Sequence, residues 1–320
     1  MSALSSRRPA AALTAGLSIL ALGLTACSTP TDEASSDPAT STAAAAGTAD
    51  AALIAELPEA IRSSQKISLG ALWETAPIIS VTTGDASTPV GVAPDLAAAL
   101  APVLDVTVDW KNMQWPAQLP GVQSGNVDAL MGQVSATAER ETSVVDLIPF
   151  YKSSMALLMN ADKTSGISGL ASMCGQKVGV PVGSIQSETI KAVSKASCAG
   201  NDIKLAEYSG ATAAISAVRA GTIAAWMDST TSQKAVAEES SDAFGVVAVP
   251  DSEFEPQYTT IAVSKDQPGL TKALLGAMKT IVENGDYAKV MEQYGLADAE
   301  ITADEVVANP VTKTAIGEKS

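Results

Sequence analysis

The chain has 320 residues, of which 46% are apolar and 4% aromatic, so its length suits two domains with cores built from alanine, valine, leucine and isoleucine. A formal net charge of −15 argues against nucleic acid or an anionic membrane surface as the main partner. The sequence lacks histidine, the commonest general base and metal ligand, and we expect neither a metal nor a cofactor.

The N-terminal residues have the pattern of an export signal. Two arginines, Arg7 and Arg8, precede an apolar run over 10–24, and the run ends in Leu24-Thr-Ala-Cys27, which looks like a lipobox. We interpret residues 1–26 as a signal peptide and Cys27 as a lipidated N-terminus that holds the exported protein at the outer face of the cell membrane. The alternative is ordinary cleavage beside an incidental cysteine.

Residues 27–52 are rich in serine, threonine, alanine and aspartate without periodicity, which predicts a disordered tether. No other apolar run reaches the roughly 18 residues of a membrane span. The lipid anchor is therefore the only membrane contact that we expect.

From residue 53 onward, short apolar runs alternate with helical patterns. In the first part we predict helices over 53–62, 95–104, 115–123 and from about 137, strands over 66–72 and 106–110 and from 128, and a long loop over 73–89. In the second part we predict strands over 155–159, 177–182, 204–208, 223–227 and 258–263, and helices over 167–173, 187–196, 212–220, 229–239, 270–284 and 286–294.

This alternation predicts an α/β fold in which each of two lobes has a mainly parallel sheet with flanking helices and right-handed crossovers. Residues 123–132 and 219–228 support two similar lobes, because each has a helix end, a glycine turn, an apolar strand and a polar turn. We place the first lobe at 53–159 and 258–297, the second lobe at 160–257, and a C-terminal tail of unassigned role at 298–320. Hinge crossings would join the two lobes.

Arg140 follows the strand that begins near residue 128 and a polar turn, three positions after Thr137. Thr137 is a good N-cap, and the free N–H groups of a helix start attract anions. A cation in a first helical turn needs an anionic partner, and the planar guanidinium suits a carboxylate. The alternative is a surface arginine that pairs with Glu139 or Glu141.

Several segments occur in an order that resembles a known family: Lys66-Ile-Ser-Leu-Gly, Gly91-Val-Ala-Pro-Asp-Leu, Gln123-Ser-Gly-Asn-Val-Asp-Ala, Ser135-x-Thr-x-Glu-Arg, Pro149-Phe-Tyr, Lys177-Val-Gly-Val and Gly183-Ser-Ile-Gln. The chain resembles the polar amino-acid-binding branch of bacterial solute-binding proteins, family 3, over roughly 57–296. The resemblance implies a two-lobed periplasmic-binding-protein fold of type II. It also implies a monomer that captures a polar amino acid and delivers it to the permease of an ABC importer, without catalysis.

By the same resemblance, Arg140 holds the α-carboxylate of the ligand, helped by the backbone N–H of Ser135. Asp228, at the end of an apolar strand in the second lobe, holds the α-ammonium group. On the residues alone, Asp228 is equally well interpreted as the N-cap of the next helix.

The turn Gly183-Ser-Ile-Gln186 follows a strand and precedes a helix, so Ser184, Ile185 and Gln186 are candidates for the carboxylate site. A simple turn and cap is the alternative. Relatives usually have threonine at the position of Ile185, and often serine or threonine at the positions of Gly132 and Gln133. Gln133 is nevertheless a candidate ligand contact.

Aromatic and acidic residues complete the expected site. Trp115 matches a position where relatives place an aromatic ring over the ligand, or it packs a helix on the sheet. Relatives often have an acidic residue where Leu72 stands and an aromatic where Thr75 stands. Trp73 and Glu74 are candidates to compensate, although Glu74 also suits an exposed loop. Leu72 argues against a lysine or arginine ligand.

Cys174 and Cys198 form an even pair in an exported chain, which favours a disulfide over two inert buried thiols. Two cysteines without histidine are too few ligands for zinc.

Two rival functions stay open. An enzyme on the same fold, such as a dehydratase, would need a general acid or base, for which Glu74 and Asp228 are the candidates. A ligand-sensing lipoprotein would bind without transport.

Overall fold

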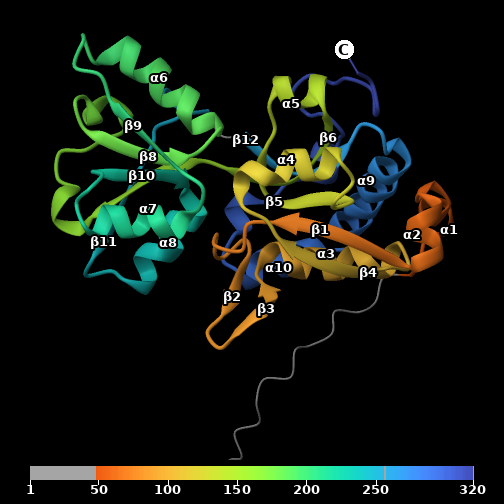
Figure 1. The fold of residues 1–320 in the computed structure, drawn as a ribbon. Helices are drawn as coiled ribbons and strands as arrows, with labels where there is room; N and C mark the ends of the chain where they lie inside the picture. Colours follow the sequence, from red (N-terminus) through yellow and green to blue (C-terminus); the bar gives the residue numbers. More distant parts are fainter. Residues whose placement is uncertain (1–47, 256, 320) are drawn as a thin grey trace, which may run out of the picture. The chain divides into compact units, whose positions relative to one another are not determined.

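The structure is a computed structural model that describes residues 48–255 and 257–319 (Figure 1). The predicted signal peptide, Cys27 and most of the predicted tether lie outside the described residues. Within the described part, no helix combines the length and the apolar character that a membrane span needs.

The first lobe contains a five-stranded sheet in the order β4-β1-β5-β12-β6 (Figure 1). The strands β4, β1 and β5 are parallel, whereas β12 is antiparallel to both of its neighbours. Their bounds are β1 Lys66–Ala71, β4 Thr107–Asn112, β5 Ala129–Ser135, β6 Val145–Ser153 and β12 Gln257–Ser264.

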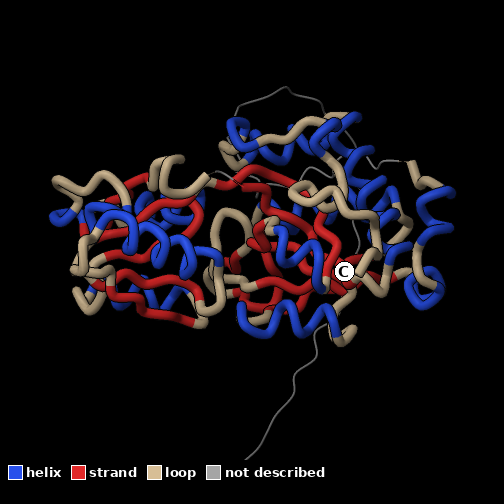
Figure 2. Tube along the Cα trace, turned by 90° about the horizontal axis from the view of Figure 1, so that it is seen from above, coloured by secondary structure: helices blue, strands red, loops and turns tan. Residues whose placement is uncertain are grey.

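Helices cover both faces of this sheet, as Figure 2 shows from above. Helix α9 illustrates why they pack there, since Leu270, Leu274, Ala277 and Ile281 recur at helical spacing and all are buried. The helices are α1 Ala51–Glu56, α2 Glu59–Ser64, α3 Val92–Val103, α4 Trp115–Gln123, α5 Ala138–Ser143, α9 Pro268–Glu283 and α10 Asp286–Gln293. The predicted long loop contains a hairpin of β2 Ser80–Thr82 and β3 Asp85–Val90.

The second lobe contains a five-stranded sheet in the order β11-β7-β10-β8-β9. Here β10, β8 and β9 are parallel, and β7 is antiparallel to β10 and β11. The strands are β7 Met155–Asn160, β8 Lys177–Pro181, β9 Lys204–Tyr208, β10 Ala225–Ser229 and β11 Phe244–Ala248, and the helices are α6 Ile185–Ser197, α7 Ala211–Arg219 and α8 Thr230–Glu239. Short 3-10 segments are η1 Ala161–Lys163, η2 Leu170–Met173, η3 Ala297–Ala299 and η4 Ala303–Glu305.

The two sheets have equivalent topologies, with three parallel strands, then one strand antiparallel to both of its neighbours, then an edge strand. Strands β5 and β10 occupy the same third position, which agrees with the predicted similarity of residues 123–132 and 219–228. Both strands end in residues that line one cavity, Ser135 in β5 and Asp228 in β10. The fold is therefore the two-lobed α/β class predicted from the sequence.

The first crossing between the sheets lies at Ser154, earlier than the boundary predicted at residue 159, because the strand from Met155 pairs within the second sheet. An uninterrupted apolar run does not reveal which sheet it joins. The strand β6 was not predicted. It contains Pro149, which is tolerated because β6 is an edge strand. The strand β11 was also missed, and the chain returns to the first sheet between β11 and β12.

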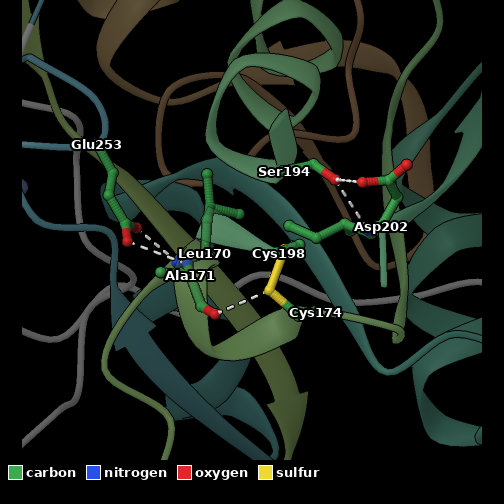
Figure 3. Close-up of a disulfide and its surroundings, with 8 residues drawn as sticks. Leu170, Ala171, Cys174, Ser194, Cys198, Asp202 and Glu253 are labelled. Carbon is green, nitrogen blue, oxygen red and sulfur yellow. Dashed lines mark hydrogen bonds between the residues drawn. A yellow bond between two sulfur atoms is a disulfide. The ribbon is translucent and has the colours of Figure 1, made fainter. Parts of the chain in front are cut away.

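The predicted disulfide is present, and the alternative of two inert thiols is wrong (Figure 3). It joins Cys174, just after η2, to Cys198, just after α6. The Glu253 carboxylate accepts hydrogen bonds from the backbone N–H groups of Leu170 (2.6 Å) and Ala171 (3.0 Å), which ties the start of η2 to the chain after β11. This end of the second lobe is therefore closed by one covalent and two polar contacts.

Candidate functional site

A cavity between the lobes encloses about 580 Å³ of space, including the solvent at its mouth. Both lobes contribute to its wall: Leu72, Thr75, Trp115, Gln118, Gln133, Ser135, Arg140, Ser153 and Thr259 from the first, and Met155, Pro181, Ser184, Ile185, Gln186, Asp228 and Ser229 from the second.

Arg140 reaches this cavity from α5 and is 9% exposed. Its Nη1 donates a hydrogen bond to the carbonyl oxygen of Ser135 (2.8 Å), and its Cζ lies 5.4 Å from the centre of the Trp115 ring. Burial lowers the pKa of the guanidinium to about 10, so it stays charged at neutral pH. Two neighbours therefore fix a cation at the cavity wall.

The surroundings of α5 refine the expectation for this arginine. Thr137 is the N-cap, as predicted, and its Oγ1 accepts from the backbone N–H of Arg140 (3.2 Å). Since that N–H is engaged and the helix is short, the guanidinium, rather than the start of α5, is the candidate group for an anion. No ion pair joins Arg140 to Glu139 or Glu141 among the described ion pairs, and the alternative of a surface pair is not supported.

Asp228 lies near the end of β10 and is 6% exposed. Its Oδ1 accepts from the backbone N–H of Ser229 (2.8 Å). The N-cap of α8 is Ser229, whose Oγ accepts from the N–H of Ser232 (3.3 Å), so the N-cap alternative for Asp228 is wrong. Burial raises the pKa of the Asp228 carboxyl to about 6, which means that ionising it in the empty cavity is unfavourable.

The turn before α6 also faces the cavity. Gly183 has a φ of +65°, which favours glycine, and the turn brings Ser184, Ile185 and Gln186 to the wall. The Oγ of Ser184 is buried and has no hydrogen-bond partner among the described residues. The start of α6 thus presents polar groups to the same space as Arg140.

Gln133 and Trp115 both line the cavity and also make contacts outside it. The Nε2 of Gln133, in the first lobe, donates to the Oγ of Ser232 (2.7 Å) and to that of Ser229 (3.3 Å) in the second. Trp115 lines the cavity and also packs against the apolar cluster beneath α4, which agrees with the predicted alternative of helix packing. Gln133 therefore lines the cavity and links the lobes at the same time.

Trp73 and Glu74 do not line the cavity, and the structure does not support their assignment as ligand contacts. Trp73 is 8% exposed and packs in the core of the first lobe. The Oε2 of Glu74 accepts from the N–H (3.1 Å) and the Oγ1 (2.8 Å) of Thr212, at the start of α7 in the other lobe. Trp73 therefore stabilises the core of the first lobe, and Glu74 connects the two lobes.

Sequence reasoning missed several wall residues, of which Gln118 is the most informative. It lies one helical turn after Trp115, so it shares the face of α4 that Trp115 presents, and this spacing was a usable signal. The other missed residues come from strand ends or from positions noted only as departures from the family pattern: Leu72, Thr75, Ser153, Met155, Pro181, Ser229 and Thr259. Within the described residues, no group of three or more acidic, cysteine or histidine side chains could hold a metal ion.

Comparison with known proteins identifies related sequences and folds. The family profile described as bacterial extracellular solute-binding proteins, family 3, matches residues 69–297. The probable histidine-binding protein of Neisseria gonorrhoeae is 26% identical over 205 residues, which cover 62% of this chain and 72% of that protein. The arginine-binding extracellular protein ArtP of Bacillus subtilis is 26% identical over 208 residues, which cover 64% of this chain and 77% of that protein.

A solved structure shows the same fold. The amino acid ABC transporter substrate-binding protein AbpA of Streptococcus pneumoniae, bound to L-arginine, superposes with a TM-score of 0.66 at 24% identity and covers 76% of this chain and 100% of that one. At this identity the likeness establishes the fold alone. The relatives named above are binding proteins rather than enzymes, in agreement with the expectation of binding without catalysis.

Proposed function

Since the chain belongs to the bacterial extracellular solute-binding proteins of family 3, we propose that it captures one free amino acid in the cavity between its lobes. One observation carries the proposal. Arg140 from the first lobe and Asp228 from the second are buried on the wall of one cavity, and neither forms an ion pair among the described side chains. The α-carboxylate and α-ammonium groups of a free amino acid complement these two charges.

Electrostatics explain why such a ligand binds well. An ionised group that is removed from water without a partner is unfavourable by several kcal/mol. In the empty cavity this penalty appears as the raised pKa of Asp228 and the lowered pKa of Arg140. A zwitterion supplies a partner to both groups at once, and its two charges contact different lobes, so binding also draws the lobes together.

The start of α6 supports the carboxylate end. Its first backbone N–H groups have no intrahelical partner, and the positive end of the helix dipole favours an anion there. The unpartnered Oγ of Ser184 is a further donor at this place. We propose that the ligand carboxylate binds Arg140 on one side and the backbone and hydroxyl of the α6 turn on the other.

Direct contacts between the lobes favour a closed cleft around the ligand. Gln133 donates to Ser232, and Glu74 accepts from Thr212. A closed cleft would exclude water, which strengthens the charge interactions inside it. We propose that the lobes open about the two crossings, at Ser154 and between β11 and β12.

We further propose that the protein is exported, is anchored through Cys27 and hands its ligand to an ABC permease as a monomer. The pattern Leu24-Thr-Ala-Cys27 and the extracellular family support the anchor and the export. Cys27→Ala should release the protein from the membrane fraction. If the variant stays in that fraction with an unchanged mature mass, the anchor is wrong. Uptake of the ligand that depends on this protein distinguishes transport from sensing.

A binding experiment tests the central proposal. Amino acids are first screened by thermal shift, and the best ligand is then titrated by calorimetry against wild type, Arg140→Ala and Asp228→Ala. Truncating one partner of a desolvated charge pair costs about 2–5 kcal/mol, on the order of thirty-fold to several thousand-fold in affinity. We expect such losses in both variants, and also when the ligand's own α-carboxylate or α-amine is blocked.

Glu139→Ala is the matched control, because Glu139 is an exposed charge on the same short helix as Arg140. It should bind within about twofold of wild type. If instead Arg140→Ala and Asp228→Ala bind within about threefold of wild type, a gap of under about 1 kcal/mol, the ligand charges lie elsewhere and the proposal fails.

A further inference from the structure

The ionisable side chains on the cavity wall are few. Among the described residues that line the cavity, Arg140 and Asp228 are the only ones that carry a charge at neutral pH. In the proposed binding mode both are neutralised by the ligand's own α-carboxylate and α-ammonium groups. The rest of the wall therefore has no countercharge to offer to a charged ligand side chain.

Two further acidic side chains, Glu74 and Glu207, are held by other partners. The Glu74 carboxylate accepts two hydrogen bonds from Thr212 and does not line the cavity. The Oε1 of Glu207 accepts from the hydroxyl of Ser187 (3.1 Å), and Glu207 is also absent from the wall. A guanidinium or ammonium group on the ligand side chain would lose its water and find no carboxylate in return.

The same argument applies to an acidic side chain. Lys152 is the cation closest in sequence to the wall residue Ser153, and its Nζ pairs with the Oε1 of Glu305 (2.7 Å). Apart from Arg140, the described wall holds no lysine or arginine. A second carboxylate in the cavity would therefore compete for the one guanidinium that the α-carboxylate already uses.

One uncharged polar group is available for the side chain. Gln118 is 2% exposed, and its Nε2 donates to the carbonyl oxygen of Met113 (3.2 Å), which orients the amide. Gln118 lines the cavity, and its Oε1 is buried without a hydrogen-bond partner among the described residues. An unpaired buried acceptor is unfavourable, and a ligand group that donates to it removes this penalty.

Resting on the proposed function, we infer that the ligand is an amino acid whose side chain is uncharged and donates a hydrogen bond to Oε1 of Gln118. Carboxamide and hydroxyl side chains meet both conditions. The apolar residues of the same wall suit the methylene groups of such a side chain: Leu72, Trp115, Met155, Pro181 and Ile185. The inferred ligand class therefore excludes arginine, although ArtP is named as an arginine-binding protein and the AbpA structure is bound to L-arginine.

Matched ligand pairs test the charge argument with the wild-type protein alone. Citrulline and arginine have nearly the same shape but differ by one charge, and glutamine and glutamate do likewise. Calorimetry should show the neutral member of each pair binding at least tenfold more tightly. Arginine or lysine binding more tightly than every neutral amino acid would overturn the inference.

The outcomes separate this inference from the proposed function. If arginine binds best and both Arg140→Ala and Asp228→Ala abolish its binding, amino-acid capture stands and the neutral side chain is wrong. If no amino acid binds, both proposals are wrong.

Substitution of Gln118 tests the assigned acceptor. Gln118→Glu places a carboxylate at the same position and should shift the ratio of arginine to citrulline affinity at least tenfold toward arginine. Gln118→Leu should reduce the preference for glutamine over the similarly sized methionine by about fivefold or more. Gln123→Glu, an exposed glutamine on the same helix, is the control and should leave both ratios unchanged. Unchanged ratios in folded Gln118 variants would show that this side chain does not contact the ligand.

Discussion

The two lobes share one sheet topology but are held together by different contacts. The second lobe is formed by one continuous segment from β7 to β11 and contains the disulfide Cys174–Cys198. The first lobe is assembled from two distant segments, and its described residues contain no cysteine. Equivalent sheets are therefore stabilised by different contacts. A lobe formed by one continuous segment can be held together by one local disulfide, whereas a lobe formed by two segments needs contacts between them.

In the first lobe a buried carboxylate makes those contacts. Asp146, in β6, accepts from Lys265 Nζ (3.0 Å), Asn309 Nδ2 (3.0 Å) and the backbone N–H of Gly317 (2.8 Å). Asp146 and Lys265 are completely buried. The predicted tail thus belongs to the first lobe, although the matched part of the family profile ends at residue 297.

The same C-terminal segment contacts the helix that carries Arg140. The buried Glu141 carboxylate accepts from the backbone N–H groups of Val311 (3.0 Å) and Thr312 (2.6 Å) and from the hydroxyl of Thr312 (2.7 Å). The short helix α5 is held on both sides, by Glu141 from outside and by Arg140 toward the cavity. Closure of the first lobe and placement of the binding cation are therefore coupled.

The largest effect is expected from removing the buried carboxylate. Asp146→Ala leaves Lys265 buried without its partner, and breaking such a pair typically lowers the free energy of unfolding by about 3–5 kcal/mol. Denaturant titration measures this loss, and hydrogen exchange should place the faster exchange in the first lobe. Asp266→Ala removes an exposed pair with Lys319 and should change stability by less than about 1 kcal/mol. Equal effects of the two variants would refute the closure assigned to Asp146.

The second lobe should depend on its disulfide to a similar but smaller extent. Replacing both Cys174 and Cys198 by serine removes a bridge between residues separated by 24 positions, which is worth about 3 kcal/mol in the chain-entropy model. Hydrogen exchange should then rise in the second lobe while the first is unaffected. Reduction of the wild type should reproduce the loss, and an effect spread over both lobes would contradict separate closures.

The coupling between closure and binding gives the third prediction. Glu141→Gln keeps the shape of the side chain but removes acceptors from a completely buried site, which should lower the free energy of unfolding by about 1–3 kcal/mol. It should also weaken ligand binding through Arg140. A double-mutant cycle with Arg140→Ala tests this, because the binding effect of Glu141→Gln should largely vanish once Arg140 is absent. Additive effects would mean that Glu141 is only structural.

The smallest predicted effect is a pH dependence of ligand affinity, which arises from Asp228 in the second lobe and not from Arg140 in the first. Between pH 5 and 8 Arg140 keeps its charge, since its pKa lies at about 10, whereas Asp228 titrates at about 6. Because the ligand ammonium needs the ionised carboxylate, affinity should be constant above about pH 7 and fall as pH drops through 6. At pH 5 we expect about tenfold weaker binding, and Asp228→Asn should bind weakly without this pH dependence. Calorimetry at several pH values decides this.

Without ligand, the effect of pH on the stability of the fold has the opposite sign to its effect on ligand affinity. The folded pKa of Asp228 is raised from 3.8, so the ionised carboxyl destabilises the empty fold at pH values above about 6. That penalty disappears as pH falls below 3.8, where both folded and unfolded chains are protonated. Saturating ligand should remove the penalty at neutral pH, which a thermal-shift comparison at pH 5 and 7 can measure.

Much of the fold follows from local patterns. The bounds of α4 and β9 agree with the prediction, because the turn residues Ser124-Gly125 and Ser209-Gly210 directly follow these elements. Thr137 is the N-cap of α5 for the same local reason. The hairpin β2–β3, by contrast, was taken for a loop, since most of its residues are exposed and no apolar alternation marks it.

For the site, local chemistry and family resemblance indicated Arg140 and Asp228, and both line the cavity. They did not reveal the partner of Glu74, which lies at Thr212. Such a contact depends on how two helices and two sheets pack, and no local periodicity encodes it.

The sequence by itself determined the two-lobed α/β plan, the charges available for binding and the pair of cysteines that form a bridge. These features depend on residue type and short spacing, which act within a few positions of the chain. Only the tertiary structure decided that Trp73 belongs to the core, that Gln118 faces the cavity and that Asn309 and Gly317 contact Asp146. Those contacts join residues far apart in sequence, and they form because apolar side chains pack away from water and most buried polar groups pair with whichever segment packs beside them.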